Sequence, residues 1–188
     1  DERNQLFEAD LAARPELAIQ RDIFVFQSVV GCRRGDLYKL TKNNIVNGIL
    51  EYVQGKTRNQ DPRTVRVPLN DVAKTILERY KDHDKGPLLP FISEQKYKQA
   101  IKEALRLAGL DRIVTVVTPL TRQPEQKFLY EVATTHTARK TFIGNMYKKV
   151  KDPDLVSSVS GHKEGSKAFR RYREIDDEMK QELVHLLD

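Results

Sequence analysis

The sequence predicts an α+β fold that is mainly α-helical and carries two small antiparallel β-hairpins. Long stretches with apolar residues at helical spacing begin at proline, serine, threonine or asparagine, residue types that favour helix starts. Two pairs of short segments rich in β-branched residues are each interrupted by a polar or proline-containing loop. With 188 residues, of which 39% are apolar, the chain can bury a single core.

The expected helices have an apolar stripe or a recognisable start and stop. Pro15 and Pro153 suit first helical positions, Gly31 and Gly161 suit C-terminal caps, and Asn70, like Ser93, is an expected N-cap. The helices are expected over about residues 15–30, 33–40, 71–80, 94–108, 136–149, 153–160 and 175–186.

The expected strands form two hairpins. Residues 49–53 and 64–67 form the first, joined by a basic, turn-forming loop over residues 56–63 that could reach a phosphate backbone. Residues 113–117 and 127–132 form the second, joined by a loop that contains two prolines. The helices and these hairpins together define the predicted architecture.

The composition and net charge of the chain indicate where it acts and what it binds. A net charge of +6 and a pI near 9.3 favour a polyanionic partner such as nucleic acid. A single cysteine, Cys32, excludes an intrachain disulfide and favours an intracellular location. No apolar run is long enough to cross a bilayer, and no signal peptide is recognisable. The first residue, Asp1, is not methionine, so a fragment of a longer protein is expected.

Three local patterns carry the chemistry of the chain. The first is Gly31-Cys32-Arg33-Arg34-Gly35-Asp36-Leu37, the second is His136-Thr137-Ala138-Arg139, and the third is Gly161-His162 followed ten residues later by Tyr172. His136 and Arg139 share one surface near a helix start, where backbone amides also favour an anion. Each residue alone would fit an exposed charge or a half-buried aromatic, so their order along the chain is the stronger evidence.

Taken in this order, the patterns resemble the catalytic domain of the tyrosine recombinases, the phage integrase family, over most of the chain from about Pro15. The integrases of phages and conjugative transposons are the most similar. The resemblance implies that Arg33, Arg139 and His162 contact the scissile phosphate and that His136 is the general base. Gly55-Lys56, at the end of the first strand, matches the position of the family's catalytic lysine, which implies that Lys56 protonates the leaving group.

Tyr172 matches the position of the family's nucleophile. Ser160 replaces a common leucine, and the interval from His162 is ten residues where nine is commoner. A phenolate at pH 7 costs roughly 4 kcal/mol, because the reference pKa of tyrosine is about 10. The neighbouring arginines and a histidine base would offset that cost. The implied product is a 3′-phosphotyrosine with a free 5′ hydroxyl, formed without metal or cofactor.

The resemblance also implies a domain organisation and partners. Residues 1–14 would be a mobile lead-in from a missing N-terminal DNA-binding region, residues 15–173 the catalytic domain, and residues 174–188 a C-terminal helix exchanged between protomers or packed in cis. The partner would be double-stranded DNA, bound by a homotetramer on synapsed sites, with accessory bending or excision factors and no membrane, in the bacterial cytoplasm. The isolated domain could be a monomer. Three residues are the expected DNA-backbone contacts: Arg58, Arg63 and Lys140.

Two other functions fit the same residues. A type IB topoisomerase uses similar tyrosine chemistry to relax supercoils, but the integrase-like patterns and the tail after Tyr172 favour a recombinase. A DNA-binding regulator could keep the fold without catalysis, although every expected catalytic position is filled.

Overall fold

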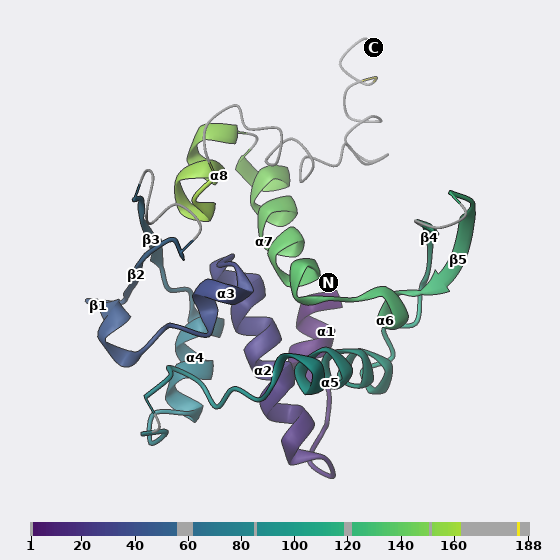
Figure 1. Cartoon of the computed structure of the whole chain (residues 1–188), viewed down its shortest axis with the longest axis horizontal. Helices are drawn as coiled ribbons and strands as arrows, with labels where there is room; N and C mark the ends of the chain where they lie inside the picture. Colours follow the sequence, from purple (N-terminus) through teal and green to yellow (C-terminus); the bar gives the residue numbers. More distant parts are fainter. Residues whose placement is uncertain are drawn as a thin grey trace.

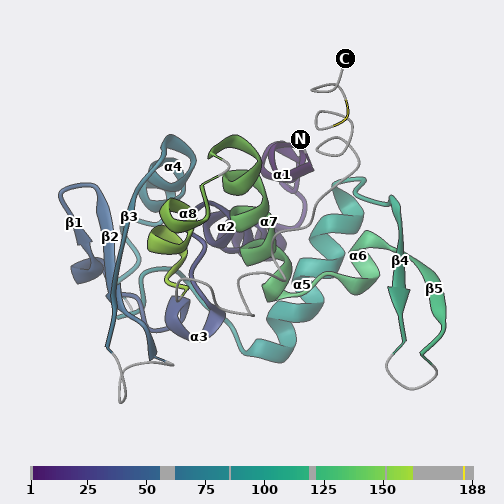
Figure 2. The same cartoon turned by 90° about the horizontal axis from the view of Figure 1, so that it is seen from above.

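The structure, a computed structural model, describes residues 2–55, 62–84, 86–118, 122–150, 152–162 and residue 184. A central helix, α2, is surrounded by α1, α4, α5 and α7 (Figure 1). A small sheet lies at one end of the molecule and a separate hairpin at the other (Figure 2). The described helices are α1 (Glu2–Glu8), α2 (Pro15–Val30), α3 (Arg34–Leu37), α4 (Asp71–Arg79), α5 (Glu94–Leu107), α6 (Leu129–Val132), α7 (Thr135–Val150) and α8 (Pro153–Ser160).

Helix α2 begins and ends where the sequence predicts. Pro15 is its first residue, where the missing N–H leaves no hydrogen bond unmade. Gly31 adopts φ +69° and donates its N–H to the carbonyl of Gln27 at 2.8 Å, which closes the C-terminal turn. Every residue from Gln20 to Val30 is buried, so the C-terminal half of α2 passes through the core.

The main core forms around α2. Phe26 and Ile23 from α2 are fully buried with Ile76 of α4, Tyr97 of α5 and Leu50 of the sheet. Burial of one such apolar side chain contributes about 1.5–3 kcal/mol relative to exposure. A smaller cluster of Phe142, Ile143 and Val156 joins α7 to α8. The ends of α2, α7 and α8 are therefore fixed relative to one another by packing.

The first predicted hairpin is confirmed and has one additional strand. Strands β2 (Ile49–Val53) and β3 (Thr64–Pro68) pair in antiparallel register, and β1 (Ile45–Val46) joins the other edge of β2. Asn47 and Gly48 both have positive φ, as the tight turn between β1 and β2 requires. The sequence predicts this turn, whereas β1 itself has only two residues and no detectable alternation. Strand β1 follows a short 3-10 helix, Lys42–Asn44.

The second hairpin differs from the prediction at its second strand. Strand β4 (Ile113–Val117) is confirmed, but β5 runs over Pro124–Phe128, and residues 129–132 form α6 instead of a strand. Pro124 pairs with Val117 at the start of β5, a position where proline's missing N–H is tolerated. The Glu131 side chain accepts from the N–H of Phe128 at 2.8 Å, which caps the short helix.

Of the two expected N-caps, only one forms a capping hydrogen bond. Asn70 Oδ1 accepts from the N–H of Ala73 at 2.9 Å and starts α4. Ser93 precedes α5 as expected, but its side chain makes no capping bond. The amphipathic pattern therefore predicted α5 correctly without that contact.

The expected mobile lead-in contains a packed helix. Leu6 of α1 is 2% exposed and packs into the main core. Arg21 donates to the carbonyl of Ala9 at 2.8 Å and pairs with Asp22 at 2.7 Å. Asp22, itself buried, also accepts from Tyr80 at 2.8 Å. These hydrogen bonds connect α1, α2 and the end of α4, a network that the apolar pattern of residues 1–14 did not indicate.

Helix α7 starts one residue earlier than expected, and α8 ends where expected. Gly161 caps α8 with φ +65° and donates its N–H to the carbonyl of Ser157. The predicted C-terminal helix over about residues 175–186 lies outside the described residues, apart from residue 184.

Candidate active site

The candidate site forms where α2, α3, α7 and α8 meet (Figures 1 and 2). Three of these elements, α3, α7 and α8, each hold or adjoin one residue of the patterns found in the sequence. Arg33 is the residue before α3, Arg139 is in α7, and His162 follows the cap of α8. The fold thus brings together side chains that are up to 129 positions apart, counted from Arg33 to His162.

Arg139 is the structural centre of this site. It is 1% exposed, and its guanidinium donates from Nη1 to the carbonyl of Gly31 and from Nη2 to the carbonyl of Ser160, the latter at 2.9 Å. The two carbonyls belong to residues that end, or adjoin the end of, α2 and α8, where helices leave acceptors unsatisfied. One buried charge therefore satisfies two helix ends and joins the first and third sequence patterns to the second.

His162 lies directly against this guanidinium. Nη2 of Arg139 is 3.1 Å from Nε2 of His162, and Ser160 Oγ is 2.9 Å from Nδ1. Burial lowers the pKa of His162 to about 3, with further lowering by the charges of Arg139 and Arg33. The ring is therefore neutral at pH 7. A proton assigned to Nδ1 would donate to Ser160 and leave Nε2 to accept from Arg139.

Arg33 brings a second positive charge to the site. Its backbone starts α3, with the Arg33 carbonyl accepting from Leu37 at 2.8 Å. Its Nη1 atom is buried without a hydrogen-bond partner among the described residues. A buried donor of this kind costs free energy unless a ligand satisfies it, and an anionic oxygen would do so. The charge also acts on His162.

His136 occupies the exposed start of α7. Its N–H donates to Thr134 Oγ1 at 3.2 Å, and Thr137 Oγ1 accepts from the N–H of Thr134 at 2.9 Å, so two threonines cap the helix reciprocally. His136 is one turn before Arg139 and is exposed, whereas Arg139 is buried. The two side chains are three positions apart on α7.

The base of the first hairpin is attached to the same site. The N–H of Gly55 donates to Asp36 Oδ1 at 2.8 Å, which connects the end of β2 with α3. Asp36, the acid of the first sequence pattern, was not among the predicted catalytic residues, and it is 6% exposed. Lys56 and Arg58, the next predicted residues on this loop, lie outside the described residues, as does Tyr172.

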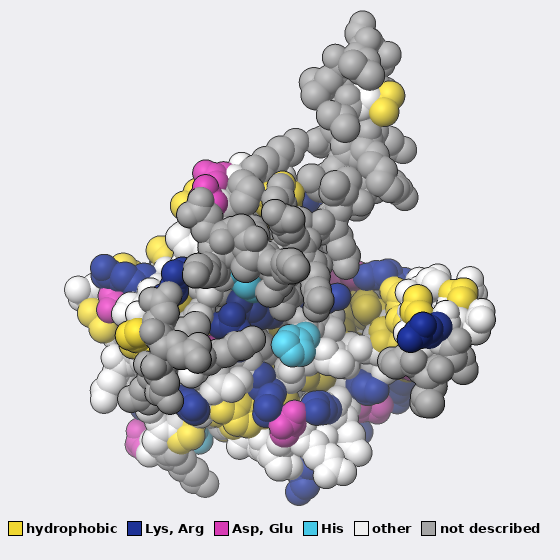
Figure 3. Space-filling model, turned by 45° about the horizontal axis from the view of Figure 1, so that its top comes forward, with side chains coloured by type: hydrophobic (Ala, Val, Ile, Leu, Met, Phe, Trp, Pro, Cys, Tyr) yellow, Lys and Arg dark blue, Asp and Glu magenta, His cyan; other side chains and the backbone are white. Residues whose placement is uncertain are grey.

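The remaining predicted DNA contacts lie at the surface. Lys140 is exposed on α7, next to the buried Arg139, and Arg63 is partly exposed where the chain enters β3. Figure 3 shows histidine side chains close to lysine and arginine side chains near the middle of one face. This face therefore combines histidine with positive charge.

The described residues give little support for a cysteine nucleophile, a metal site or a membrane-spanning helix. Cys32 is fully buried, and burial raises the pKa of its thiol to about 12, so it is not a thiolate nucleophile at neutral pH. No group of three histidine, cysteine, aspartate or glutamate side chains in the described ranges has a geometry suited to a metal ion. Among the same residues, no helix has the length and apolar character to cross a membrane.

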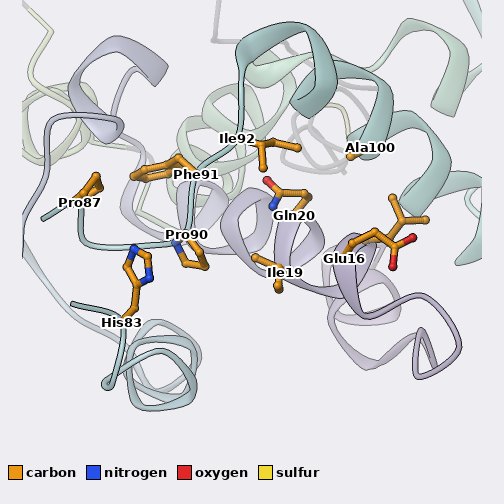
Figure 4. Close-up of a pocket in the computed structure, with 10 residues that line it drawn as sticks. Glu16, Ile19, Gln20, His83, Pro87, Pro90, Phe91, Ile92 and Ala100 are labelled. Atoms are coloured by element: carbon orange, nitrogen blue, oxygen red, sulfur yellow. The ribbon is translucent and has the colours of Figure 1, made fainter. Parts of the chain in front are cut away.

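Two hollows lie away from the residues of the candidate site. One, of about 480 Å³, is lined by residues of α2, α5 and the 83–92 segment, including Gln20 and Phe91 (Figure 4). The other, of about 680 Å³, lies between α1, α7 and β4, and Lys140 is at its border. Neither hollow is lined by Arg33, Arg139 or His162.

The fold is that of solved tyrosine recombinases. The chain is 18% identical to XerA recombinase with a TM-score of 0.67, covering 99% of this chain and 63% of that one. A lambda integrase tetramer bound to a Holliday junction gives 19% identity and a TM-score of 0.62, and the match covers 93% of this chain and 46% of that one. The lambda integrase catalytic core is 19% identical with a TM-score of 0.60, and the match covers 89% of this chain and 91% of that one. The chain thus spans less than two thirds of the first two structures and most of the third.

Comparison with curated protein sequences gives no significant match. The sequence profile of the phage integrase family matches residues 1–179, nearly the whole chain. The ordered patterns, the fold and this match lead to one assignment: the chain belongs to the phage integrase family, and its fold is that of the tyrosine recombinase catalytic domain.

Proposed function

We propose that this chain is the catalytic domain of a site-specific recombinase that cleaves and rejoins double-stranded DNA during integration or excision of a mobile element. The contacts of Arg139 with Gly31, Ser160 and His162 are the observation that carries the proposal. They place three separate sequence patterns around one buried positive charge. An isolated basic patch would not need such a buried arrangement.

The proposed role of the buried cations is to stabilise a phosphate. Two arginines that contact the non-bridging oxygens would neutralise charge that grows as phosphorus becomes five-coordinate. Arg33 supports this role because its buried Nη1 lacks a partner among the described residues. His162 is neutral, so with its proton on Nε2 it would donate to a phosphate oxygen without adding charge; this is the other tautomer from the one that donates from Nδ1 to Ser160.

The proposed reaction balances without an external reagent. The Tyr172 hydroxyl oxygen attacks phosphorus while its proton passes to His136, and the bond from phosphorus to the 5′ oxygen breaks as Lys56 protonates that oxygen. The phosphodiester becomes a phosphotyrosine diester, so a 5′ hydroxyl from another strand can reverse the step. No nucleotide or metal cofactor enters this scheme.

The proposed assembly is a homotetramer on two synapsed DNA duplexes. The similar fold of lambda integrase, solved as a tetramer on a Holliday junction, supports this assembly. Residues 174–188 are proposed to pass between protomers, residues 1–14 to connect to a DNA-binding region, and accessory bending or excision factors to assist. Arg58, Arg63 and Lys140 are the proposed backbone contacts, and the proposed location is the bacterial cytoplasm.

The test uses the full-length protein and nicked suicide duplexes that tile the DNA flanking its gene, incubated in EDTA. A nick next to the cleavage position releases a short fragment, so the covalent adduct accumulates. We expect an adduct on a denaturing gel, mapped to Tyr172 by peptide analysis and absent in Tyr172→Phe. If no duplex yields an adduct with the full-length protein, the proposed function is wrong. Supercoil relaxation without strand-transfer product would instead indicate a topoisomerase.

A further inference from the structure

Gln27 contacts the turn between α2 and Arg33 through its backbone and through its side chain. Its carbonyl accepts from the N–H of Gly31 at 2.8 Å, and its Nε2 donates to the carbonyl of Cys32 at 3.0 Å. Gln27 lies about one turn before the end of α2 and is 1% exposed. No sequence pattern indicated Gln27, because a single glutamine in an apolar helix has no distinctive spacing.

The side-chain contact fixes the peptide group that leads into Arg33. The Cys32 carbonyl belongs to the peptide that joins Cys32 to Arg33, and Cys32 is fully buried. This carbonyl therefore cannot turn to water if the glutamine donor is removed, and an unsatisfied buried acceptor is costly. The peptide would have to rotate to find another donor. Such a rotation changes the direction in which the Arg33 backbone leaves the turn.

Contacts from α7 and within α3 hold the chain on either side of this peptide. On one side, the Gly31 carbonyl accepts from Arg139, and a Cβ atom added at Gly31 would overlap the ring of Phe142. On the other side, the Arg33 carbonyl accepts from the N–H of Leu37 at 2.8 Å and starts α3. The peptide held by the glutamine therefore lies between two fixed points of the site.

The guanidinium of Arg33 depends on this backbone for its direction. Its Nη1 atom is buried without a hydrogen-bond partner among the described residues, so no bond from that atom orients the group. Burial lowers the pKa of His162, and the charges of Arg139 and Arg33 lower it further, which places the Arg33 guanidinium near the buried imidazole. A change in the Arg33 backbone would therefore move this charge within the candidate site.

We propose that Gln27 is a positioning residue that holds the peptide between Cys32 and Arg33, so that the Arg33 guanidinium faces the phosphate oxygens. Gln27 itself does not touch the phosphate and acts only through Arg33. This inference rests on the proposed function, in which Arg33 stabilises the charge that grows on the phosphate. Displacement of a reacting or stabilising group by about 1 Å costs on the order of 100-fold in rate.

The primary variant is Gln27→Met, which keeps the length of the side chain and removes its donor. Gln20→Met is the matched control, because Gln20 belongs to the same helix, is also buried, and has an Oε1 without a partner among the described residues, as Gln27 has. Gln20 lines the separate hollow in Figure 4. Single-turnover adduct formation is measured with the full-length protein on the cleaved duplex identified above. We expect a rate roughly 10- to 100-fold lower for Gln27→Met and an unchanged rate for Gln20→Met.

A double-mutant cycle with Arg33→Ala separates positioning of Arg33 from general damage to the fold. Arg33→Ala alone should be slower than wild type by about 100- to 1,000-fold, the cost of losing one donor at a developing negative charge. Addition of Gln27→Met to Arg33→Ala should then change the rate by less than about twofold, because the group that Gln27 positions is absent. A further loss as large as the one in the wild-type background, or no loss in either background, would overturn the inference.

Gln27→Asn is a second variant in case urea unfolding shows that Gln27→Met folds poorly. It keeps the amide but shortens the side chain by one methylene group, so the donor no longer reaches the Cys32 carbonyl. We expect the same pattern, a loss when Arg33 is present and none in the Arg33→Ala background, and additive losses would contradict the inference. If the wild-type protein forms no adduct, the proposed function has failed and this inference with it. A wild-type adduct with undiminished rates for both Gln27 variants refutes the inference alone.

Discussion

Nη2 of Arg139 lies 3.1 Å from Nε2 of His162, and this pair connects α7 with the turn that follows α8. The same Nη2 donates to Ser160, so the position of the imidazole depends on the arginine and on the helix end together. The arrangement places a buried cation directly beside a neutral imidazole. Arg139 therefore joins two helix ends and also contacts the imidazole.

Arg139→Lys should lower the rate of DNA cleavage by about 100- to 1,000-fold, the cost of losing one preorganised donor at a developing negative charge. Lysine keeps the charge but cannot reach both the Gly31 and Ser160 carbonyls with planar, forked donors. The rate is measured by single-turnover adduct formation, with urea unfolding run in parallel. A lysine variant with at least half of the wild-type rate would contradict the assigned geometry.

Gly161→Ala should destabilise the fold more than Gly48→Ala. Both glycines have positive φ, +65° and +75°, so alanine is strained at either position. A Cβ at Gly48 meets nothing within 4 Å, whereas a Cβ at Gly161 overlaps Gln54. We expect a loss of about 1 kcal/mol for Gly48→Ala from backbone strain, and a larger loss for Gly161→Ala. Equal losses in urea unfolding would show that the close packing at Gly161 is unimportant.

The sequence predicted those parts of the fold that depend on local chemistry. The limits of α2 follow from Pro15 and Gly31, and the limits of β2 follow from a β-branched segment after Asn47-Gly48. The order of Arg33, Arg139 and His162 predicted that these residues share one site, and the structure brings them together. These features need only short-range signals or a recognised order of patterns.

The parts that were missed depend on contacts between distant residues. Helix α1 is fixed by Leu6 in the core and by the Arg21 contact with Ala9, which no pattern within residues 1–14 reveals. The switch from β5 to α6 depends on the Glu131 side chain reaching the Phe128 N–H, although residues 127–132 have strand-like composition. The contact of Gln54 with Gly161 was missed for the same reason, because the two residues are 107 positions apart.

Cys32 should react slowly with thiol reagents in the folded protein. It is fully buried, and burial raises its pKa to about 12, so very little thiolate exists at pH 8. We expect alkylation by iodoacetamide at pH 8 to proceed at least 100-fold faster in 6 M guanidinium than in buffer. Comparable rates would mean that the end of α2 opens readily and that Cys32 is accessible in the folded protein.

Substitution of Lys140 should weaken DNA binding through charge alone. The side chain is exposed on α7, beside the buried Arg139. Lys140→Gln is expected to reduce the slope of log affinity against log salt concentration by about 1 and to affect all duplex sequences similarly. Lys74→Gln removes one positive charge at an exposed residue of α4 and is the matched control for the change in net charge. An unchanged salt slope for Lys140→Gln would exclude a phosphate contact.

The free energy of unfolding should decrease as pH falls from about 6.5 toward 3. In the folded chain the pKa of His162 is lowered to about 3 by burial and by Arg139 and Arg33, whereas an unfolded histidine has a pKa near 6.5. Between these values the unfolded chain binds a proton that the folded chain does not. Acidification therefore favours the unfolded state, and the contribution of His162 is fully present only above about pH 6.5.

The measurement is urea unfolding of the wild-type chain and of His162→Gln at pH 8, 6.5, 5.5 and 5. At pH 8 both side chains are neutral, so the difference there gives the cost of the substitution itself. The difference should shrink as pH falls, because the variant has no imidazole to protonate on unfolding, while most carboxyl groups are still ionised above pH 5. A difference that stays constant from pH 8 to 5 would mean that Arg139 and burial do not lower the pKa of His162 in solution.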